Sequence, residues 1–418
     1  MKSYAILNNN KFLTQRIHSE EIEAGTYARA DFQRDRDRIM HSRAFRRMMH
    51  KTQIFNANIG DHYRNRLTHT LEVSQIARSI GKNLELNDEL IEAIALGHDL
   101  GHTPFGHVGE KTLNYILNTS DFFITEAPNQ FFKHNLQSLR LIDELESRCE
   151  DYPGLNLTLA VREGILKHTE TTDKNKNELS YPMSNYDNIT LSKPSFTLEG
   201  QIVAIADEIA QCTHDLEDSV RSGIISFDDV INNQLVKNVT EQYNIQIDAH
   251  TKTPAYDTRN RIIKVLIGFF IENICTTSQP LIDSYMSKYK PTFNSKNTCF
   301  NEQCIVLSET VEKQKDELYN MITNKVICSA IISASDAKSE LIIKELFKAF
   351  YNHPKILPDY ILKKYCIRKE TAFNRVNINE EDLQKDPDFI RTICDHIAGM
   401  TDQFASREYF RLYIPDHT

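Results

Sequence analysis

The chain has 418 residues, 40% of them hydrophobic and 26% charged, so it can bury the core of one large domain or two ordinary ones. Its net charge of −9 argues against bulk binding of nucleic acid by charge alone. The eight cysteines include no CxxC pair, which argues against a zinc ribbon and suits a reducing cytosol. Without an apolar signal core or a run of about 18 apolar residues, we expect a cytoplasmic protein without a membrane segment.

The N-terminal part of the chain is locally basic. Residues 28–51 carry eight Lys and Arg side chains against three Asp, and their apolar positions predict a helix. Two interpretations stay open for this segment: a solvated helix with internal salt bridges, or a basic wall that faces phosphate or another subunit. Residues 53–66 contain Asn and Gly turn signals and predict a loop.

Two amphipathic helices are predicted next. The first covers residues 68–86, where apolar side chains recur at helical spacing and His69 lies in the first turn. Asp88 can cap the second helix, which would deliver His98 and Asp99 at its C-terminal end. A neutral imidazole beside a hard carboxylate is a donor pair for divalent Mn, Fe, Zn or Mg.

The segment LGHDLGHTPFGHVGE, residues 96–110, places three histidines, one aspartate and one glutamate within fifteen residues. Gly101 and Pro104 indicate that the helix stops there and the chain turns. A new helix after this break would bring His107 and Glu110 together at positions i and i+3. One isolated histidine is usually a core residue, but five such groups at this density favour a site.

The rest of the chain predicts more helices and few strands. The clearest helices cover residues 134–146, 157–167 and 195–220. Residues 169–194 are polar and predict an insertion, and the chain from about residue 223 onward alternates helical stretches with short links. Because strand-like alternation is scarce and no GxGxxG or P-loop sequence occurs, we expect an all-α fold.

Asp207 lies in the middle of the apolar predicted helix 195–220. A carboxylate in such a place is costly unless it is paired or bound to a metal. His69, the His98-Asp99 pair and Asp207 follow one another on three predicted helices. This H…HD…D order resembles the HD-domain phosphohydrolase superfamily, and it indicates a metal site without naming a substrate.

The flanking sequence narrows the resemblance. Six blocks in this order look like the deoxyguanosine triphosphate triphosphohydrolase family: DFQRDRDRIMHSRAFRRMMHKTQIF, RNRLTHTLEVSQIAR, LGHDLGHTPFGHVGE, FKHNLQSLRLI, ADEIAQCTHDLEDSVRSG and DHIAGMTDQFASREYFRLY. The resemblance runs from roughly residue 29 to residue 225 and returns near Asp395. Six ordered blocks are far more specific than a single HD dipeptide.

The resemblance implies an HD-domain helical core with an additional C-terminal helical region. We therefore divide the chain into a basic helical segment (1–58), a metal-dependent phosphohydrolase core (59–225) and a C-terminal helical region (226–418). The implied reaction splits a dNTP into deoxynucleoside and inorganic triphosphate by attack at the α-phosphorus. Dependence on dGTP alone is not implied, because several dNTPs would fit the same pattern.

The resemblance also assigns roles to positions. The positions that match metal ligands are His69, His98, Asp99 and Asp207. His107 and Glu110 match the catalytic pair, with His107 as general acid or base. The positions that match substrate contacts are Arg66 and His102 for phosphate, Gln53 near the sugar, Asp215 for the 3′-hydroxyl and His134 lining the site.

One position departs from the family pattern. Gln211 stands one turn after Asp207, where many relatives carry a tyrosine that packs against the deoxyribose. A glutamine adds hydrogen-bonding capacity and removes a ring, so we expect Gln211 to contact the substrate without carrying over the family's sugar and base preferences. A dNTP triphosphohydrolase is therefore favoured over a dGTP-specific one. We assign no metal role to His168 and His214, because four protein ligands are already named.

The resemblance implies one protein-bound divalent ion (Mn, Mg, Fe or Zn) and a second ion arriving with the triphosphate. It further implies a homo-oligomer, hexamer or tetramer, with dNTP as allosteric activator and single-stranded DNA as a partner. Two alternatives stay open: another HD-domain nucleotide phosphohydrolase (nucleotidase, alarmone or cyclic-nucleotide hydrolase), or a regulatory module that binds nucleotide or single-stranded DNA without turnover. The His107 and Glu110 pair argues against the regulatory module, since a pure sensor needs no acid/base couple.

Overall fold

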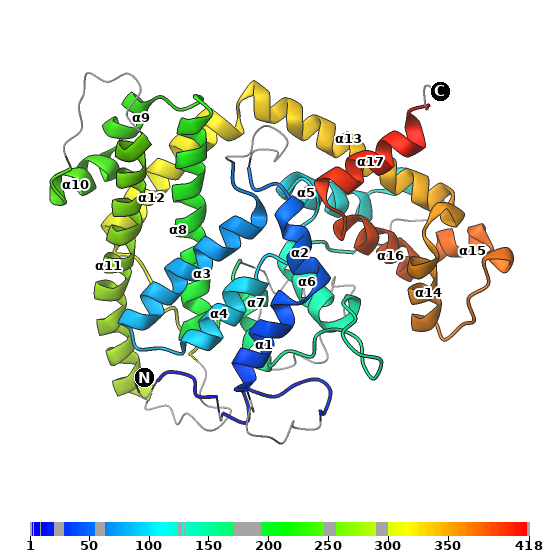
Figure 1. Cartoon of the computed structure of the whole chain (residues 1–418), viewed down its shortest axis with the longest axis horizontal. Coiled ribbons are helices and arrows are strands. Elements are labelled where there is room, and N and C mark those ends of the chain that lie inside the picture. The colour runs from blue at the N-terminus through cyan, green and yellow to red at the C-terminus, as the bar shows by residue number, and fades with distance from the viewer. Residues whose placement is uncertain are drawn as a thin grey trace.

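Figure 1 shows the computed structural model of the chain. The structure describes residues 2, 4–8, 10–20, 29–54, 63–123, 128, 130–170, 194–245, 256–289 and 300–415. Within these residues every named element is a helix, and β pairing is limited to two isolated bridges, Thr52 with Asn65 and Ser147 with Gly154. The expected all-α fold is confirmed.

One group of helices is built around α8, which lies next to α11 toward one end of the molecule. This group consists of α1 (Asp31–Met40), α2 (Arg43–Arg47), α3 (Arg66–Asn83), α4 (Asp88–Gly97), α6 (His134–Arg140), α7 (Leu159–Lys167), α8 (Leu198–Arg221), α9 (Phe227–Asn232), α10 (Gln234–Gln242), α11 (Tyr256–Tyr289) and α12 (Glu309–Ile322). The helices α3, α4, α7, α11 and α12 all pack against α8, and α1 covers α4. Their apolar faces enclose the larger of two hydrophobic clusters.

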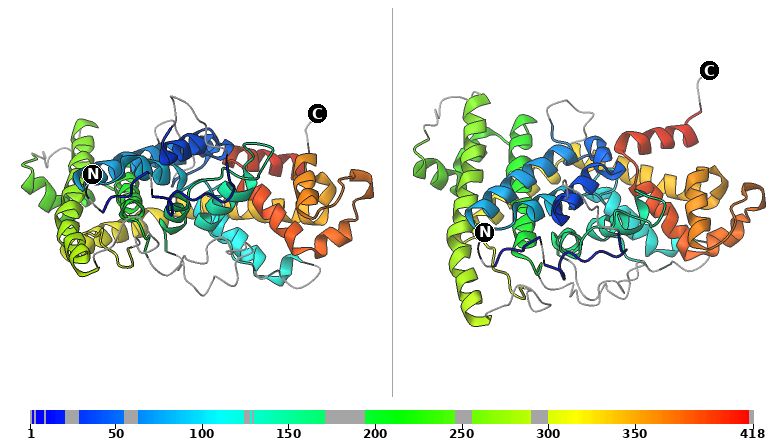
Figure 2. Two further views of the ribbon diagram at one scale, coloured as in Figure 1. Left: turned by 90° about the horizontal axis from the view of Figure 1, so that it is seen from below. Right: turned by 60° about the horizontal axis from the view of Figure 1, so that its bottom comes forward.

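A second group of helices forms the other end of the molecule. It consists of α5 (His107–Leu117), α13 (Ala330–Asn352), α14 (Asp359–Arg368), α15 (Glu380–Lys385), α16 (Pro387–Ala398) and α17 (Asp402–Tyr413). The long α13 packs against α5, α16 and α17 around a second hydrophobic cluster. Figure 2 shows α11 at one end of the elongated molecule and α14 and α15 at the opposite end.

Short irregular turns complete the described elements. Four are 3₁₀ turns, at Met48–His50, Ser120–Phe122, Pro354–Ile356 and Arg375–Asn377, and two are π-helical turns, at Leu141–Leu145 and Thr323–Ile327. The π turn after α6 means that the predicted helix 134–146 changes its winding at residue 141. Most of the predicted insertion 169–194 lies outside the described residues.

The basic segment differs from the single helix that we predicted. It divides into α1, α2 and a 3₁₀ turn, because Ser42 caps a new helix by accepting a hydrogen bond from the Phe45 amide at 3.1 Å. The arginines of α1 are paired within the chain: Arg34 and Arg38 bind Glu20 at 2.7 and 2.6 Å, and Arg36 binds Glu92 at 3.2 Å. For these three residues the structure favours the salt-bridged interpretation.

The helix α11 is longer than the sequence suggests, since helical spacing predicts only residues 260–275 and the helix continues through Pro280. Among the described helices, α11 has the length and composition to cross a membrane: within Thr258–Tyr289 its most apolar 18-residue window has a mean hydropathy of 1.3. This is weak evidence, because a core helix of a soluble protein passes the same test. Here α11 packs along α3, α8 and α10.

Candidate functional site

Three helices deliver the predicted metal ligands. Asn65 caps α3 by accepting a hydrogen bond from the Thr68 amide at 2.9 Å, so Arg66 and His69 lie in the first helical turn, and both are buried. The helix α4 ends at Gly97 and places His98 at its C-terminal cap, with Asp99 directly after it. Asp207 lies near the middle of α8, which packs against both of these helices.

The four predicted ligands come together at this junction. The Nε2 atom of His69 lies 2.9 Å from Oδ1 of Asp207, and Nε2 of His98 lies 3.6 Å from the same oxygen and 3.5 Å from Oδ2 of Asp99. His98 donates its Nδ1 hydrogen to the Ala95 carbonyl at 2.6 Å, while its buried Nε2 has no hydrogen-bond partner. Ligand atoms of His69, His98 and Asp99 lie within 4.8 Å of one another, and Asp207 joins them through its contacts with both histidines. Two imidazoles and two carboxylates fit a divalent transition metal.

The charges at this junction suit a cation. Burial would raise the pKa values of Asp99 and Asp207, but the surrounding histidines, and Arg66 at Asp99, hold both well below their usual range. Burial would lower the pKa of His98, but the Asp99 and Asp207 carboxylates outweigh it and raise that pKa to about 9. Both carboxylates are therefore ionised, and a metal would displace a proton from His98.

The second predicted pair stands at the start of α5. Gly106 precedes this helix with φ +60, a left-handed conformation that favours glycine, and Thr103 Oγ1 donates to its carbonyl at 2.8 Å. His107 is 54% exposed, and its Nδ1 lies 3.8 Å from Glu110 Oε2. The same carboxylate oxygen lies only 2.6 Å from Nδ1 of His134, so Glu110 is held more closely by His134 than by His107.

Glu110 is ionised in this setting. Burial would raise the pKa of its carboxyl group, but the hydrogen bonds from His107 and His134 hold that pKa far below its usual range. The pair predicted from positions i and i+3 is thus part of a group of four, in which the Glu110 carboxylate lies between the imidazoles of His107 and His134, and His102 is the fourth member.

Hydrogen bonds to the C-terminal helices hold the turn between α4 and α5 in place. Asp402, at the first turn of α17, accepts hydrogen bonds from the Thr52 amide at 2.7 Å and the Phe105 amide at 2.9 Å. Lys51 is buried and donates to the carbonyls of His102 and Ala398, and burial lowers its pKa to about 7. Residues about 300 positions apart therefore support one loop, which no local pattern in the sequence predicts.

Two of the predicted phosphate contacts are already engaged with Asp99. Arg66 is buried, and one of its terminal nitrogens lies 2.6 Å from Asp99 Oδ2 while its Nε has no partner. His102 contacts Asp99 Oδ1 through Nε2 at 3.1 Å and stacks on His134 with ring centroids 4.0 Å apart. Burial, with Arg66, lowers the pKa of His102 well below its usual range, so this ring is neutral.

Two further predicted contacts, Gln53 and Asp215, each have a buried side-chain oxygen without a hydrogen-bond partner. The backbone carbonyl oxygen of Gln53 lies close to Gly106, 3.7 Å from the position that a Cβ atom would take at this glycine. The side-chain Oε1 of Gln53 is buried and has no hydrogen-bond partner. Asp215 is buried, and burial together with Asp218 and Asp207 raises its pKa well above the usual range. This raised pKa favours the protonated carboxyl group, which can donate a hydrogen bond.

From the sequence, Tyr319 was not identified and no metal role was assigned to His168 and His214, but all three residues lie near the site. Nδ1 of His214 lies 3.1 Å from Nδ1 of His69, and Nε2 of His168 lies 3.2 Å from Nε2 of His134. The hydroxyl of Tyr319, on α12, lies 3.5 Å from Nε2 of Gln211. Tyr319 thus places an aromatic ring next to Gln211, whose own side chain has none. Of these three residues, only His168 could have been identified from the sequence, because it directly follows a predicted helix, as His98 does.

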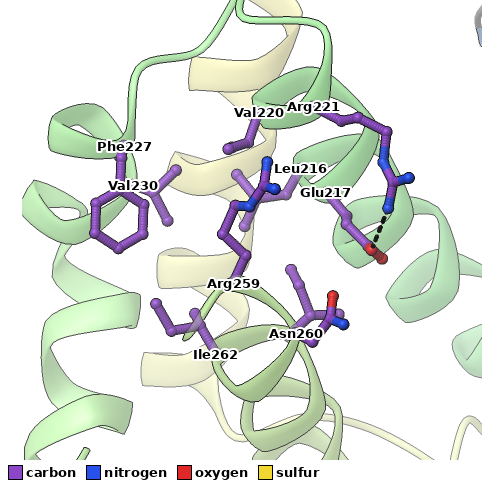
Figure 3. Close-up of a pocket in the computed structure, with 10 residues that line it drawn as sticks. Leu216, Glu217, Val220, Arg221, Phe227, Val230, Arg259, Asn260 and Ile262 are labelled. Carbon is purple, nitrogen blue, oxygen red and sulfur yellow. Dashed lines mark hydrogen bonds and ion pairs between the residues drawn. The ribbon is translucent and has the colours of Figure 1, made fainter. Parts of the chain in front are cut away.

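A pocket elsewhere in the molecule contains none of the predicted site residues. It lies between the end of α8, α9 and the start of α11 (Figure 3), and it is lined mainly by apolar side chains such as Leu216, Phe227 and Ile262. Arg221 and Arg259 are its cationic members, and Arg221 binds Glu217 at 3.4 Å.

Comparisons with known proteins agree with this geometry. Residues 66–211 match the HD domain family, and residues 305–411 match the phosphohydrolase-associated domain. The first of these ranges begins at Arg66 and includes all four predicted metal ligands. The chain is therefore an HD-domain protein, and these matches support a metal-binding phosphohydrolase.

Relatives narrow the family. A deoxyguanosinetriphosphate triphosphohydrolase-like protein of Geobacter sulfurreducens is 35% identical over 400 residues, which cover 96% of this chain and 92% of the relative. Proteins with the same description from Bordetella pertussis (36% over 387 residues, 92% and 90%) and Thiobacillus denitrificans (34% over 399 residues, 95% and 94%) are similar throughout. The chain belongs to the deoxyguanosinetriphosphate triphosphohydrolase-like family, as the sequence blocks indicated.

Proposed function

We propose that this protein is a metal-dependent dNTP triphosphohydrolase, which converts dGTP or several dNTPs into deoxynucleoside and inorganic triphosphate. The observation that carries the proposal is the convergence of His69, His98, Asp99 and Asp207 beside the imidazole-carboxylate group of His107, Glu110 and His134. The names of the relatives point in the same direction. In this proposal the four converging residues are the metal ligands.

A divalent ion in this position supplies Lewis acidity at a phosphate oxygen. His107 is the exposed imidazole of the group, so it can reach a bound substrate and donate a proton to the departing 5′-oxygen. Ionised Glu110 lies 3.8 Å from Nδ1 of His107 and places a negative charge beside this ring. Water adds to the α-phosphorus, the bond from phosphorus to the 5′-oxygen breaks, and triphosphate leaves with the added oxygen.

The predicted substrate contacts have specific tasks in this proposal. Arg66 offers its unpartnered Nε to phosphate. Neutral His102 donates its Nε2 hydrogen to ionised Asp99, so its unpartnered Nδ1 carries a lone pair and can contact phosphate only through a water molecule. The raised pKa of Asp215 favours its protonated form, which can donate to the 3′-oxygen of the sugar, and its buried Oδ2 has no hydrogen-bond partner. Gln211 and Tyr319 together replace the tyrosine of many relatives, so they are the candidates for sugar discrimination.

The proposal extends to assembly and location. We propose a cytoplasmic homo-oligomer that dNTPs activate and that single-stranded DNA can bind. The exposed Arg43 and Arg46 of α2 leave a cationic surface, in contrast to the paired arginines of α1. This surface is the candidate contact for an anionic activator or strand.

The test is a product assay with the four dNTPs and the four NTPs, each with Mn²⁺ or Mg²⁺, singly and as mixtures. We expect deoxynucleoside and triphosphate in equal amounts, and none from Asp207→Asn, which keeps the shape of the side chain but loses one anionic ligand. Release of phosphate or pyrophosphate would instead identify another type of HD phosphohydrolase. Binding without turnover of any nucleotide would identify a regulatory module.

A further inference from the structure

The turn before α5 contains two successive residues in the left-handed region of the backbone. Phe105 has φ +61 and Gly106 has φ +60. Glycine adopts this conformation freely, but it is unfavourable for a side chain as large as that of phenylalanine. Because α5 begins at His107, directly after these residues, the path of the turn determines where the His107 imidazole lies.

The C-terminal helices hold Phe105 in this conformation. Its amide donates to Oδ1 of Asp402, a buried residue in the first turn of α17, at 2.9 Å. Its ring is buried in the second hydrophobic cluster, together with Phe347 of α13 and Ile393 of α16. An unfavourable backbone conformation persists where the surrounding contacts outweigh its cost, and here those contacts come from the C-terminal part of the chain.

The second oxygen of Asp402 holds the start of α3. Oδ2 accepts hydrogen bonds from the amide of Thr52 at 2.7 Å and from the hydroxyl of the same residue. Thr52 forms an isolated antiparallel bridge with Asn65, the N-terminal cap of α3. Beside this bridge, the Arg66 amide donates to the Lys51 carbonyl at 3.1 Å. The carboxyl group of Asp402 therefore joins the start of α3 to the turn before α5.

These two helices are packed in different groups of the fold. The helix α3, which carries His69, packs against α4 and α8, whereas α5, which carries His107, packs against α13 and α16. The place of His107 relative to the predicted metal ligands therefore depends on how the two groups are joined. A displacement of about 1 Å at a reacting group can slow a reaction roughly 10²-fold, so this junction matters for catalysis.

We propose that Asp402 is a positioning residue for the reaction, which fixes the His107 imidazole relative to the metal ligands through the amides of Phe105 and Thr52. It acts through these residues and does not itself touch the substrate. The inference rests on the role of His107 as proton donor in the proposed function and extends that function to the C-terminal helices. It gives the phosphohydrolase-associated domain, residues 305–411, a task at the active centre.

The test compares two substrates with different leaving groups. In the proposed reaction His107 protonates the departing 5′-oxygen. A dNTP with sulfur in place of the bridging 5′-oxygen loses a thiolate and needs no such proton, because the pKa of a thiol is only about 8.5. Water still adds to the α-phosphorus, the bond from phosphorus to sulfur breaks, and triphosphate is released. Loss of fold or metal slows both substrates alike, whereas a misplaced His107 slows the oxygen substrate alone.

Asp402→Asn replaces one acceptor oxygen with an amide group that opposes a backbone donor. We expect kcat for the oxygen substrate to fall roughly 10–100-fold, with kcat for the sulfur substrate and the metal content unchanged. In the His107→Gln background the same substitution should cost nothing further, because the proton donor that Asp402 positions is already gone. The matched control is Thr52→Val, which removes only the hydroxyl bond to Asp402, so both substrates should keep their wild-type rates.

Gly106→Ala disturbs the turn without altering Asp402. The Cβ atom would lie 3.4 Å from its nearest neighbour, Nη2 of Arg66, so it fits, but the positive φ strains alanine. We expect the same selective loss with the oxygen substrate. This variant decides the matter if Asp402→Asn loses its helical circular dichroism, and the His107→Gln background decides it if the wild type does not cleave the sulfur substrate.

The outcomes separate this inference from the proposed function. Three results in folded Asp402→Asn would overturn the positioning role alone while the wild type still releases triphosphate: an equal loss on both substrates, a loss that persists in the His107→Gln background, or unchanged rates. A wild-type protein that releases no triphosphate from any dNTP would overturn the proposed function, and the positioning role with it.

Discussion

The direction in which each histidine points is set by the partner of its other nitrogen. Ala95 and Ile165 accept from Nδ1 of His98 and His168, and Glu110 accepts from Nδ1 of His134. In all three rings Nε2 is left for the centre of the site. His107 differs, because it is half-exposed and is held only at 3.8 Å by Glu110. This looser setting suits a group that exchanges protons with a substrate.

Replacement of His107 tests this distinction. For His107→Gln we expect kcat to fall roughly 10²–10⁴-fold, the usual loss for a general acid or base. The metal content should stay unchanged, because Gln removes the proton transfer but no proposed metal ligand. Rate measurements and elemental analysis on one preparation decide the matter. A variant that loses its metal, or that keeps its rate, would contradict the role assigned to His107.

Helix termini join distant parts of the chain. Glu199, in the first turn of α8, accepts hydrogen bonds from the amides of Ile6 at 3.0 Å and Asn87 at 3.2 Å. Asn87 in turn caps α4 by accepting from the Glu89 amide at 3.1 Å. One carboxyl group thus ties the N-terminal segment to two helices of the metal site. Burial raises the pKa of Glu199 to about 7.

This raised pKa predicts a pH-dependent stability. The folded protein binds the Glu199 proton more tightly than the unfolded chain, whose ordinary pKa is 4.5, so the contribution is present below 4.5 and lost as pH rises through 7. Glu199→Gln stays neutral at every pH, and we expect it to match the wild type near pH 5 and to exceed it above pH 8. The shift sets an upper limit of roughly 3 kcal/mol on this gain.

Urea unfolding at several pH values measures the effect. Glu309 is 84% exposed on its side chain and provides the control, since Glu309→Gln should follow the wild type at all pH values. Stability curves of wild type and Glu199→Gln that stay parallel from pH 5 to pH 8 would show that Glu199 is ionised in the folded protein.

At the scale of the whole molecule, α11 flanks one end of the bundle. Its inward side buries Leu266, Phe270 and Ile274 against the larger hydrophobic cluster. Its outward side exposes charged residues, among them Arg261, Lys264 and Glu272. Only 28% of its most apolar window is buried, but charges at the outward positions would be costly in lipid.

We therefore expect α11 to act as a packed surface helix rather than a membrane span. After cell lysis without detergent, the full chain should remain in the supernatant of a high-speed centrifugation at both low and high salt. Recovery only after addition of detergent would contradict this. The same supernatant, analysed by light scattering, reports whether the native mass is that of the proposed oligomer.

Several features of this protein can be predicted from patterns of residues that lie close together in the sequence. Helical spacing and scarce alternation predicted the all-α fold, which is confirmed, and the ordered blocks predicted the family, which the relatives also show. The pair His107 and Glu110 was predicted at one helix start, and α5 begins at His107. These features depend on residues a few positions apart, whose relation follows from the helical repeat itself.

Other features were decided only by the packing of distant helices. Glu110 lies closer to His134 than to His107, His168 faces His134, and Asp402 holds the turn before α5. Each contact joins residues that are 24 to 297 positions apart. A pattern along the chain gives the residue types that are available to a site. The crossing of α4, α7 and α8 determines which nitrogen meets which oxygen, because the packing of the apolar faces sets the distances between the helices.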